Sequence, residues 1–150
     1  MKIKLAVSRE RYAEVERLLT QRGITVDADG DFVLTENNRY PDRLMVRDGD
    51  SGERVILPVE DIVLIEAFGH SLAVRTLGKS YEVSQRLYKI LGTLEPEKFL
   101  RISNSVVIAK DKVTSISPTF SMKFVLTMAN GQKVDVTRSY YYLFKESFGI

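Results

Sequence analysis

The sequence predicts an α+β protein in which a small β-α-β-β unit precedes a mainly β domain. In residues 1–35 one helical pattern lies between strand patterns, whereas from residue 55 onward most apolar runs are short and alternate with polar residues. Residues 36–54 are polar and contain Pro41 and the motif DGDSGE, a composition typical of a connection. We therefore expect two domains, 1–54 including this linker and 55–150.

The predicted elements of the N-terminal unit are a strand at 2–7, a helix at 8–22 with Ser8 as its N-cap, a strand at 24–26, a turn at 27–31 and a strand at 32–35. The turn contains the motif DADGDF, which resembles half of a calcium loop. It lacks the glycine and the glutamate that such a loop requires, so a hairpin turn is the better interpretation. The first strand ends without the acidic residues of a phosphorylatable receiver, and the role of the unit stays open.

The second domain is predicted to contain strands at 55–57, 62–68, 72–77, 80–83, 102–108, 113–117, 123–128 and 133–137. Asn130-Gly131 lies between the last two strands and is typical of a tight hairpin. Ser84 is suited to cap a helix whose leucines and isoleucine recur at helical spacing before Pro96. A last short helix is expected over 140–148.

The stretch FLRISNSVVIAKDKV, residues 99–113, combines strand spacing with a polar centre. Asn104 falls on the same face as Ile102 and Val106, where an unpaired amide would cost a few kcal/mol. Two interpretations are open: a hydrogen-bonded structural amide, or a side chain that reaches a molecule outside the protein. We expect residues 103–105 to interrupt the strand before residues 106–108.

The composition is that of an ordinary globular protein, with 44% hydrophobic and 28% charged residues in 150. There is no cysteine, no apolar run near 18 residues and no signal-peptide pattern, which together fit a cytoplasmic bacterial protein. The single histidine, His70, has no marked catalytic partners, and no metal-ligand cluster or glycine-rich phosphate loop is present. We expect no enzymatic activity, no metal and no cofactor.

Charge is distributed unevenly although the formal net charge is only +2. Residues 98–150 carry eight basic against three acidic side chains, which is compatible with a surface that faces phosphates. Three polar residues, His70, Asn104 and Arg138, lie at ends or interruptions of predicted strands. Each has a side chain suited to base edges in DNA, although each by itself is also explained as a turn residue, a bonded amide or a surface arginine.

Several segments together resemble a known family. They are VEDIVLIEAFGH, KSYEVSQRLYKILGTLEPEKFLRISNSVVIAKDKVTSI, FVLTMANGQKVDVTRSY and LFKESFGI, in this order over residues 55–150. This part of the chain resembles the LytTR DNA-binding domain of bacterial transcription regulators. The resemblance implies an elongated β-β-β arrangement of about ten strands with short helices, and loops that enter successive major grooves.

The resemblance also implies roles for individual residues. His70, Asn104 and Arg138 match the base-contacting positions of the family, and the positions that contact the DNA backbone correspond to Arg101, Ser105, Ser71, Lys110, Ser139 and Tyr141. The expected partner is double-stranded DNA with repeated half-sites about one helical turn apart, bound by a homodimer or by two copies per site. The expected function is a sequence-specific transcription regulator that is response-regulator-like but has no receiver. The alternative is a non-catalytic protein-interaction module, an anti-regulator that pairs with a DNA-binding partner.

Overall fold

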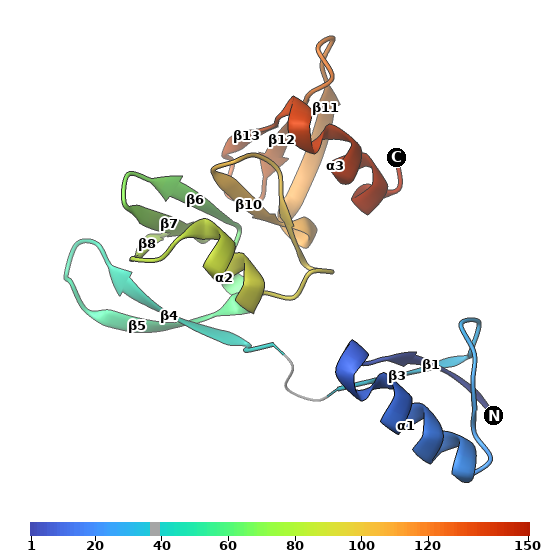
Figure 1. Ribbon diagram of the computed structural model, residues 1–150. Coiled ribbons are helices and arrows are strands. Elements are labelled where there is room, and N and C mark those ends of the chain that lie inside the picture. Colours follow the sequence, from blue (N-terminus) through green and yellow to red (C-terminus); the bar gives the residue numbers. More distant parts are fainter. Residues whose placement is uncertain (37–39) are drawn as a thin grey trace. The chain divides into compact units, whose positions relative to one another are not determined.

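The computed structural model describes residues 1–36 and 40–150, and the chain forms two compact units, Met1–Arg39 and Tyr40–Ile150 (Figure 1). The strand-rich α+β architecture predicted from the sequence is confirmed. Residues 40–54, predicted as part of a linker, belong to the second unit. Within the described residues, no helix has both the length and the apolar character needed to cross a membrane.

The first unit contains β1 (Lys2–Ala6), α1 (Arg9–Gln21), β2 (Thr25–Val26) and β3 (Phe32–Thr35). The predicted hairpin between the last two strands is wrong: β2 and β3 flank β1 on opposite sides, and both run parallel to it. Residues 27–31 therefore cross β1, and a Cβ atom on Gly30 would lie 2.6 Å from the backbone of Ile3 and Lys4. Glycine is required here because the two backbones touch. Ser8 is the N-cap residue of α1, although its hydroxyl makes no capping hydrogen bond.

The core of the first unit is small. Among its described residues only Ile3 and Leu5 of β1 are buried apolar side chains, and α1 buries none. Phe32 on the edge strand β3 remains 61% exposed. Units of about 40 residues or fewer usually need additional stabilisation because they bury little apolar surface. The stability of this unit therefore depends on two side chains.

Leu5→Ala should unfold the first unit without unfolding the second. The substitution removes one of two buried side chains, and comparable core truncations cost about 2–5 kcal/mol. Hydrogen exchange followed by mass spectrometry should show loss of protection in residues 1–36 and unchanged protection in 62–74. Loss of protection in both ranges would contradict the independence of the two cores.

The second unit contains ten strands in two antiparallel sheets (Figure 1). The larger sheet has the order β5-β4-β8-β7-β6-β10-β9, and the smaller has the order β11-β12-β13. The strands of the larger sheet are β4 (Arg43–Asp48), β5 (Arg54–Pro58), β6 (Leu64–Phe68), β7 (Ser71–Arg75), β8 (Ser80–Val83), β9 (Phe99–Arg101) and β10 (Val106–Ala109). Those of the smaller sheet are β11 (Val113–Pro118), β12 (Phe124–Met128) and β13 (Lys133–Val136). The helices are α2 (Leu87–Thr93) and α3 (Tyr141–Phe148), with short 3-10 turns at Val59–Asp61, Lys110–Lys112 and Arg138–Tyr140.

Two local interpretations require correction. Strand β4 lies in the segment predicted to be a connection. The prediction missed it because the last inward-facing position of the strand is the carboxylate Asp48, which interrupts the apolar alternation. Helix α2 begins at Leu87 with Arg86 at the N-cap, so Ser84 lies before the helix and does not cap it. The hairpin at Asn130-Gly131 is confirmed: it joins β12 and β13, and Gly131 has a φ of +86°.

Strand β10 connects two hydrophobic cores. All four of its residues are buried. Val107 packs with Ile65 into a core beneath α2, whereas Ile108 packs with Leu64 into a core formed with the smaller sheet and Phe144 of α3. The register of β10 against β6 pairs Val107 with Ile65 and Ile108 with Leu64, so alternate side chains of both strands enter opposite cores. The smaller sheet is thereby held against a defined edge region of the larger one.

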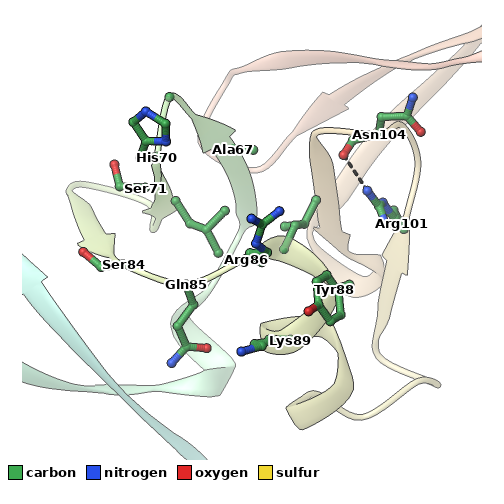
Figure 2. Close-up of a pocket in the computed structure, with 13 residues that line it drawn as sticks. Ala67, His70, Ser71, Ser84, Gln85, Arg86, Tyr88, Lys89, Arg101 and Asn104 are labelled. Atoms are coloured by element: carbon green, nitrogen blue, oxygen red, sulfur yellow. Dashed lines mark hydrogen bonds between the residues drawn. The ribbon is translucent and has the colours of Figure 1, made fainter.

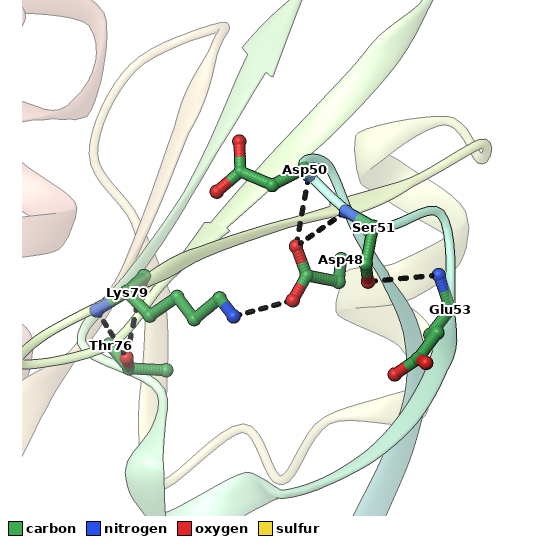
Figure 3. A network of polar contacts seen from close by, with 6 residues as sticks. All are labelled: Asp48, Asp50, Ser51, Glu53, Thr76 and Lys79. Carbon is green, nitrogen blue, oxygen red and sulfur yellow. Dashed lines mark hydrogen bonds and ion pairs between the residues drawn. The ribbon is translucent and has the colours of Figure 1, made fainter.

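A polar network joins two turns at the other end of the larger sheet (Figure 3). The buried Asp48 accepts hydrogen bonds from the backbone N–H groups of Asp50 and Ser51 and from Lys79 Nζ. The hydrogen bond from Lys79 is the main cause of a lowered pKa at Asp48, and the same contact raises the pKa of Lys79. The ion pair therefore fixes the β4–β5 turn to the β7–β8 turn.

Asp48→Asn should lower the melting temperature of the second unit at neutral pH but not in acid. Because the folded-state pKa of Asp48 lies below its usual value of 3.8, its stabilising contribution is present above that pH and disappears as pH falls through the folded-state pKa. The contribution of Lys79 is present below its usual value of 10.5 and disappears as pH rises through its raised pKa. Thermal unfolding at several pH values should show this window, with Asp50→Asn as the matched control. A pH-independent difference between Asp48→Asn and the unsubstituted protein would contradict the ion-pair explanation.

Candidate nucleic-acid interface

Three connections of the second unit present the polar residues singled out in the sequence. His70 lies in the turn between β6 and β7, Asn104 in the loop between β9 and β10, and Arg138 at the start of the 3-10 turn that follows β13. All three side chains are exposed. Two backbone hydrogen bonds tie the connections together: Ala67 N–H donates to Ser105 O at 2.7 Å, and Thr137 N–H donates to Ile102 O at 3.0 Å. The central loop is therefore bonded to both of its neighbours.

The β6–β7 turn is tight because Phe68 pairs with Ser71, which leaves Gly69 and His70 as the two turn residues. Gly69 has a φ of +62°, a conformation that glycine adopts without strain. The Ser71 hydroxyl donates to Phe68 O at 3.3 Å and closes the turn. His70 is thus held at the tip of a short hairpin.

The loop that carries Asn104 is organised by Arg101. The Arg101 guanidinium donates to Ser103 O at 3.1 Å and to Asn104 O at 2.6 Å. Ser105 N–H donates to the Ser103 hydroxyl at 3.2 Å. These bonds define the loop conformation, and the expected interruption of the strand at residues 103–105 is confirmed. Asn104 lies outside the apolar face, so its exposure does not create a buried unpaired amide.

The Asn104 side chain is linked to the C-terminal part of the domain. Tyr140 OH donates to Asn104 Oδ1 at 3.2 Å, and the Arg101 guanidinium lies 6.0 Å from the centre of the Tyr140 ring. Tyr140 ends the 3-10 turn that Arg138 begins. Tyr140 therefore links the Asn104 amide to the 3-10 turn that contains Arg138, and Ser105 and Ser139 are exposed beside these two residues in sequence.

Two predicted backbone-contacting residues have structural roles. Lys110 Nζ donates to Ser147 O at 3.1 Å near the end of α3 and lies six residues beyond Asn104, at the opposite end of β10. The extended chain between them spans roughly 20 Å. The Tyr141 ring stacks on Phe124 with centroids 5.0 Å apart. The assignment of both residues to DNA contacts stays a prediction.

A hollow of about 570 Å³ lies beside two of the three polar residues (Figure 2). His70, Ser71, Arg101 and Asn104 line it on one side. The remaining polar lining comes from the segment before and within the first turn of α2: Ser84, Gln85, Arg86, Tyr88 and Lys89. None of its lining residues is acidic. Its basic side chains make it a surface suited to an anion.

Sequence reasoning missed Arg86 and Lys89. Their only signal was two basic residues at the start of a predicted helix, and nothing local indicated that this helix would begin beside the β6–β7 turn. The part of the chain that the structure describes contains no group of three His, Cys, Asp or Glu side chains placed to hold a metal ion.

Fold and surface together define a β-rich domain with short loops that expose polar side chains, and the comparison with family models identifies its family. Residues 52–149 match the LytTr DNA-binding domain. The chain belongs to this family.

Two of the relatives are named sensory transduction proteins. The chain is 27% identical over 117 residues to Sensory transduction protein LytR of Staphylococcus saprophyticus, and 31% identical over 112 residues to Sensory transduction protein LytT of Bacillus subtilis. These alignments cover 77% and 73% of this chain and 46% of each relative, so the chain spans about half the length of either. A solved LytTr DNA-binding domain from Bacillus cereus has the same fold, with a TM-score of 0.68 at 21% identity over 73% of this chain and 99% of that one.

Asn104→Ala should leave the stability of the second unit almost unchanged. The side chain is exposed, and substitutions at exposed positions usually change the free energy of unfolding by less than about 0.5–1 kcal/mol. Ile102→Ala is the matched comparison two residues away, because Ile102 is fully buried and its truncation should cost about 2–5 kcal/mol. Chemical denaturation measures both. A loss at Asn104→Ala as large as that at Ile102→Ala would favour a structural role for the amide.

Proposed function

We propose that the protein is a sequence-specific transcription regulator that binds double-stranded DNA through the loops of its second unit. Membership of the LytTr family supports DNA binding, and the relatives named as sensory transduction proteins support a regulatory role. The single observation on which the proposal rests is that three loops tied by hydrogen bonds present His70, Asn104 and Arg138 to solvent.

The chemistry of each side chain suits a base edge in the major groove. Arginine binds guanine O6 and N7 with two donors, asparagine pairs with adenine through its amide, and histidine donates to an acceptor. The connection between Tyr140 and Asn104 Oδ1 would orient the amide so that its NH₂ group faces outward. Exposed hydroxyls at Ser105 and Ser139 are suited to phosphate oxygens, which fix the register of a protein on DNA.

Two copies would occupy each DNA target. One unit presents a short reading surface, and a pair of half-sites about one helical turn apart presents the same face of the duplex to both copies. The second unit is non-catalytic in this proposal. An anti-regulator that acts only by pairing with another DNA-binding protein would not bind DNA by itself, so direct binding distinguishes the two functions.

Arg138→Ala should reduce discrimination between DNA sequences more than it reduces binding to random DNA. A lost bidentate contact to guanine costs about 1–3 kcal/mol at one base pair and nothing at unrelated sequences. The measurement is fluorescence anisotropy with a duplex recovered by genomic footprinting and with a scrambled duplex of equal length. The control is Arg54→Ala, at the start of β5, which is the edge strand of the larger sheet farthest from β9. It should leave the ratio of the two affinities unchanged. Equal losses on both duplexes for Arg138→Ala would contradict a base-reading role.

A further inference from the structure

We propose that the hollow between the β6–β7 turn and the start of α2 is a phosphate-binding subsite, in which Arg86 and Lys89 contact a phosphodiester of the DNA strand beside the base pairs that His70 and Asn104 read. This inference rests on the proposed function and adds two binding residues to it. Its ligand is a DNA backbone phosphate and not a free anion.

The first argument is charge. Three lining side chains, Arg86, Lys89 and Arg101, are cationic, and none of the lining residues is acidic. An anion in this concave surface would therefore meet positive charge from more than one side. The hollow has a volume of about 570 Å³ and is open to solvent, so a phosphate of the DNA strand can enter it from outside.

The second argument is that Arg86 and Lys89 are uncommitted. Other basic residues of the same sheet region are paired with carboxylates: Arg47 with Glu82, Arg75 with Glu66 and Lys79 with Asp48. Within the described part of the chain, Arg86 and Lys89 take part in no ion pair, and both are exposed. Their charges are available to a ligand.

Arg101 has a different role in the same hollow. Its guanidinium is bonded to the carbonyl oxygens of Ser103 and Asn104, so it fixes the loop conformation. It acts as a positioning residue, and Arg86 and Lys89 provide the contacts that a phosphate needs. Arginine offers a planar pair of donors and lysine a compact charge, which together suit a phosphodiester with two free oxygens.

The hollow lies next to two of the residues that we propose to contact DNA bases. His70 and Asn104 belong to its lining, so a phosphate held by Arg86 and Lys89 lies next to the bases that these two residues would contact. Phosphate contacts set the orientation of a protein on DNA but do not discriminate between sequences. Arg86 and Lys89 should therefore contribute affinity and salt dependence without contributing specificity.

The test is the double substitution Arg86→Gln with Lys89→Gln, measured on the full chain with specific and scrambled duplexes at several salt concentrations. The logarithm of the binding constant falls linearly with the logarithm of salt concentration, and loss of two phosphate contacts should make this slope less steep by about 1.8. The ratio of the affinity of the unsubstituted protein to that of the double variant should therefore fall by about tenfold between 50 and 200 mM salt, and equally on both duplexes. Thermal unfolding should be unchanged because both side chains are exposed.

The matched control is Arg54→Gln with Lys112→Gln, which removes the same charge from β5 and from the 3-10 turn that precedes β11, outside the hollow. If both double variants have the same salt slope as the unsubstituted protein, the subsite is refuted while the proposed function stands. If the unsubstituted protein binds neither duplex, the proposed function itself is refuted. Titration with inorganic phosphate alone should show no saturable binding below millimolar concentration; saturable micromolar binding lost in the Arg86→Gln, Lys89→Gln variant would assign the hollow to a free anion and overturn the inference.

Discussion

The architecture of the second unit depends on the double burial of strand β10. Its alternate side chains enter two different cores, so one four-residue strand fixes the smaller sheet and α3 to the larger sheet. Antiparallel sheets commonly leave one face to solvent, and a strand with both faces buried is under stricter constraint. A shift of β10 by one residue would exchange its two faces and disrupt both cores. The loop between β9 and β10 therefore ends at a strand whose register is fixed by two cores.

This constraint separates the scaffold from the residues that face solvent. The loop before β10 is held by backbone bonds to β6 and to the end of β13, and Arg101 satisfies two of its carbonyl groups. The side chains of His70, Asn104 and Arg138 are left exposed outside both cores. Exposed side chains on loops held by a buried scaffold can be substituted with little effect on the packing of the cores.

The sequence predicted those features that are determined locally. Asn130-Gly131 specifies its hairpin through the φ of Gly131, and the polar residues 103–105 indicate an interrupted strand. It failed where the cause is tertiary. Asp48 can occupy an inward position of β4 because Lys79, 31 residues away, pairs with it. Gly30 resembles a turn residue in the sequence, but glycine is required there because the connection passes against the backbone of β1. The proximity of Arg86 and Lys89 to His70 likewise follows from how β7, β8 and α2 pack. The roles of the three exposed residues came from family resemblance and not from spacing.

The central claim is that exposed side chains on a rigid pair of sheets read base edges in the major groove. It is tested most directly by selecting duplexes from a random pool with the purified protein and then mapping guanine N7 protection on the selected DNA. The account predicts enrichment of one sequence, with N7 protection in two patches about one helical turn apart on the same face of the duplex. Binding without enrichment of any sequence, or enrichment without protection of N7 in the major groove, would contradict it.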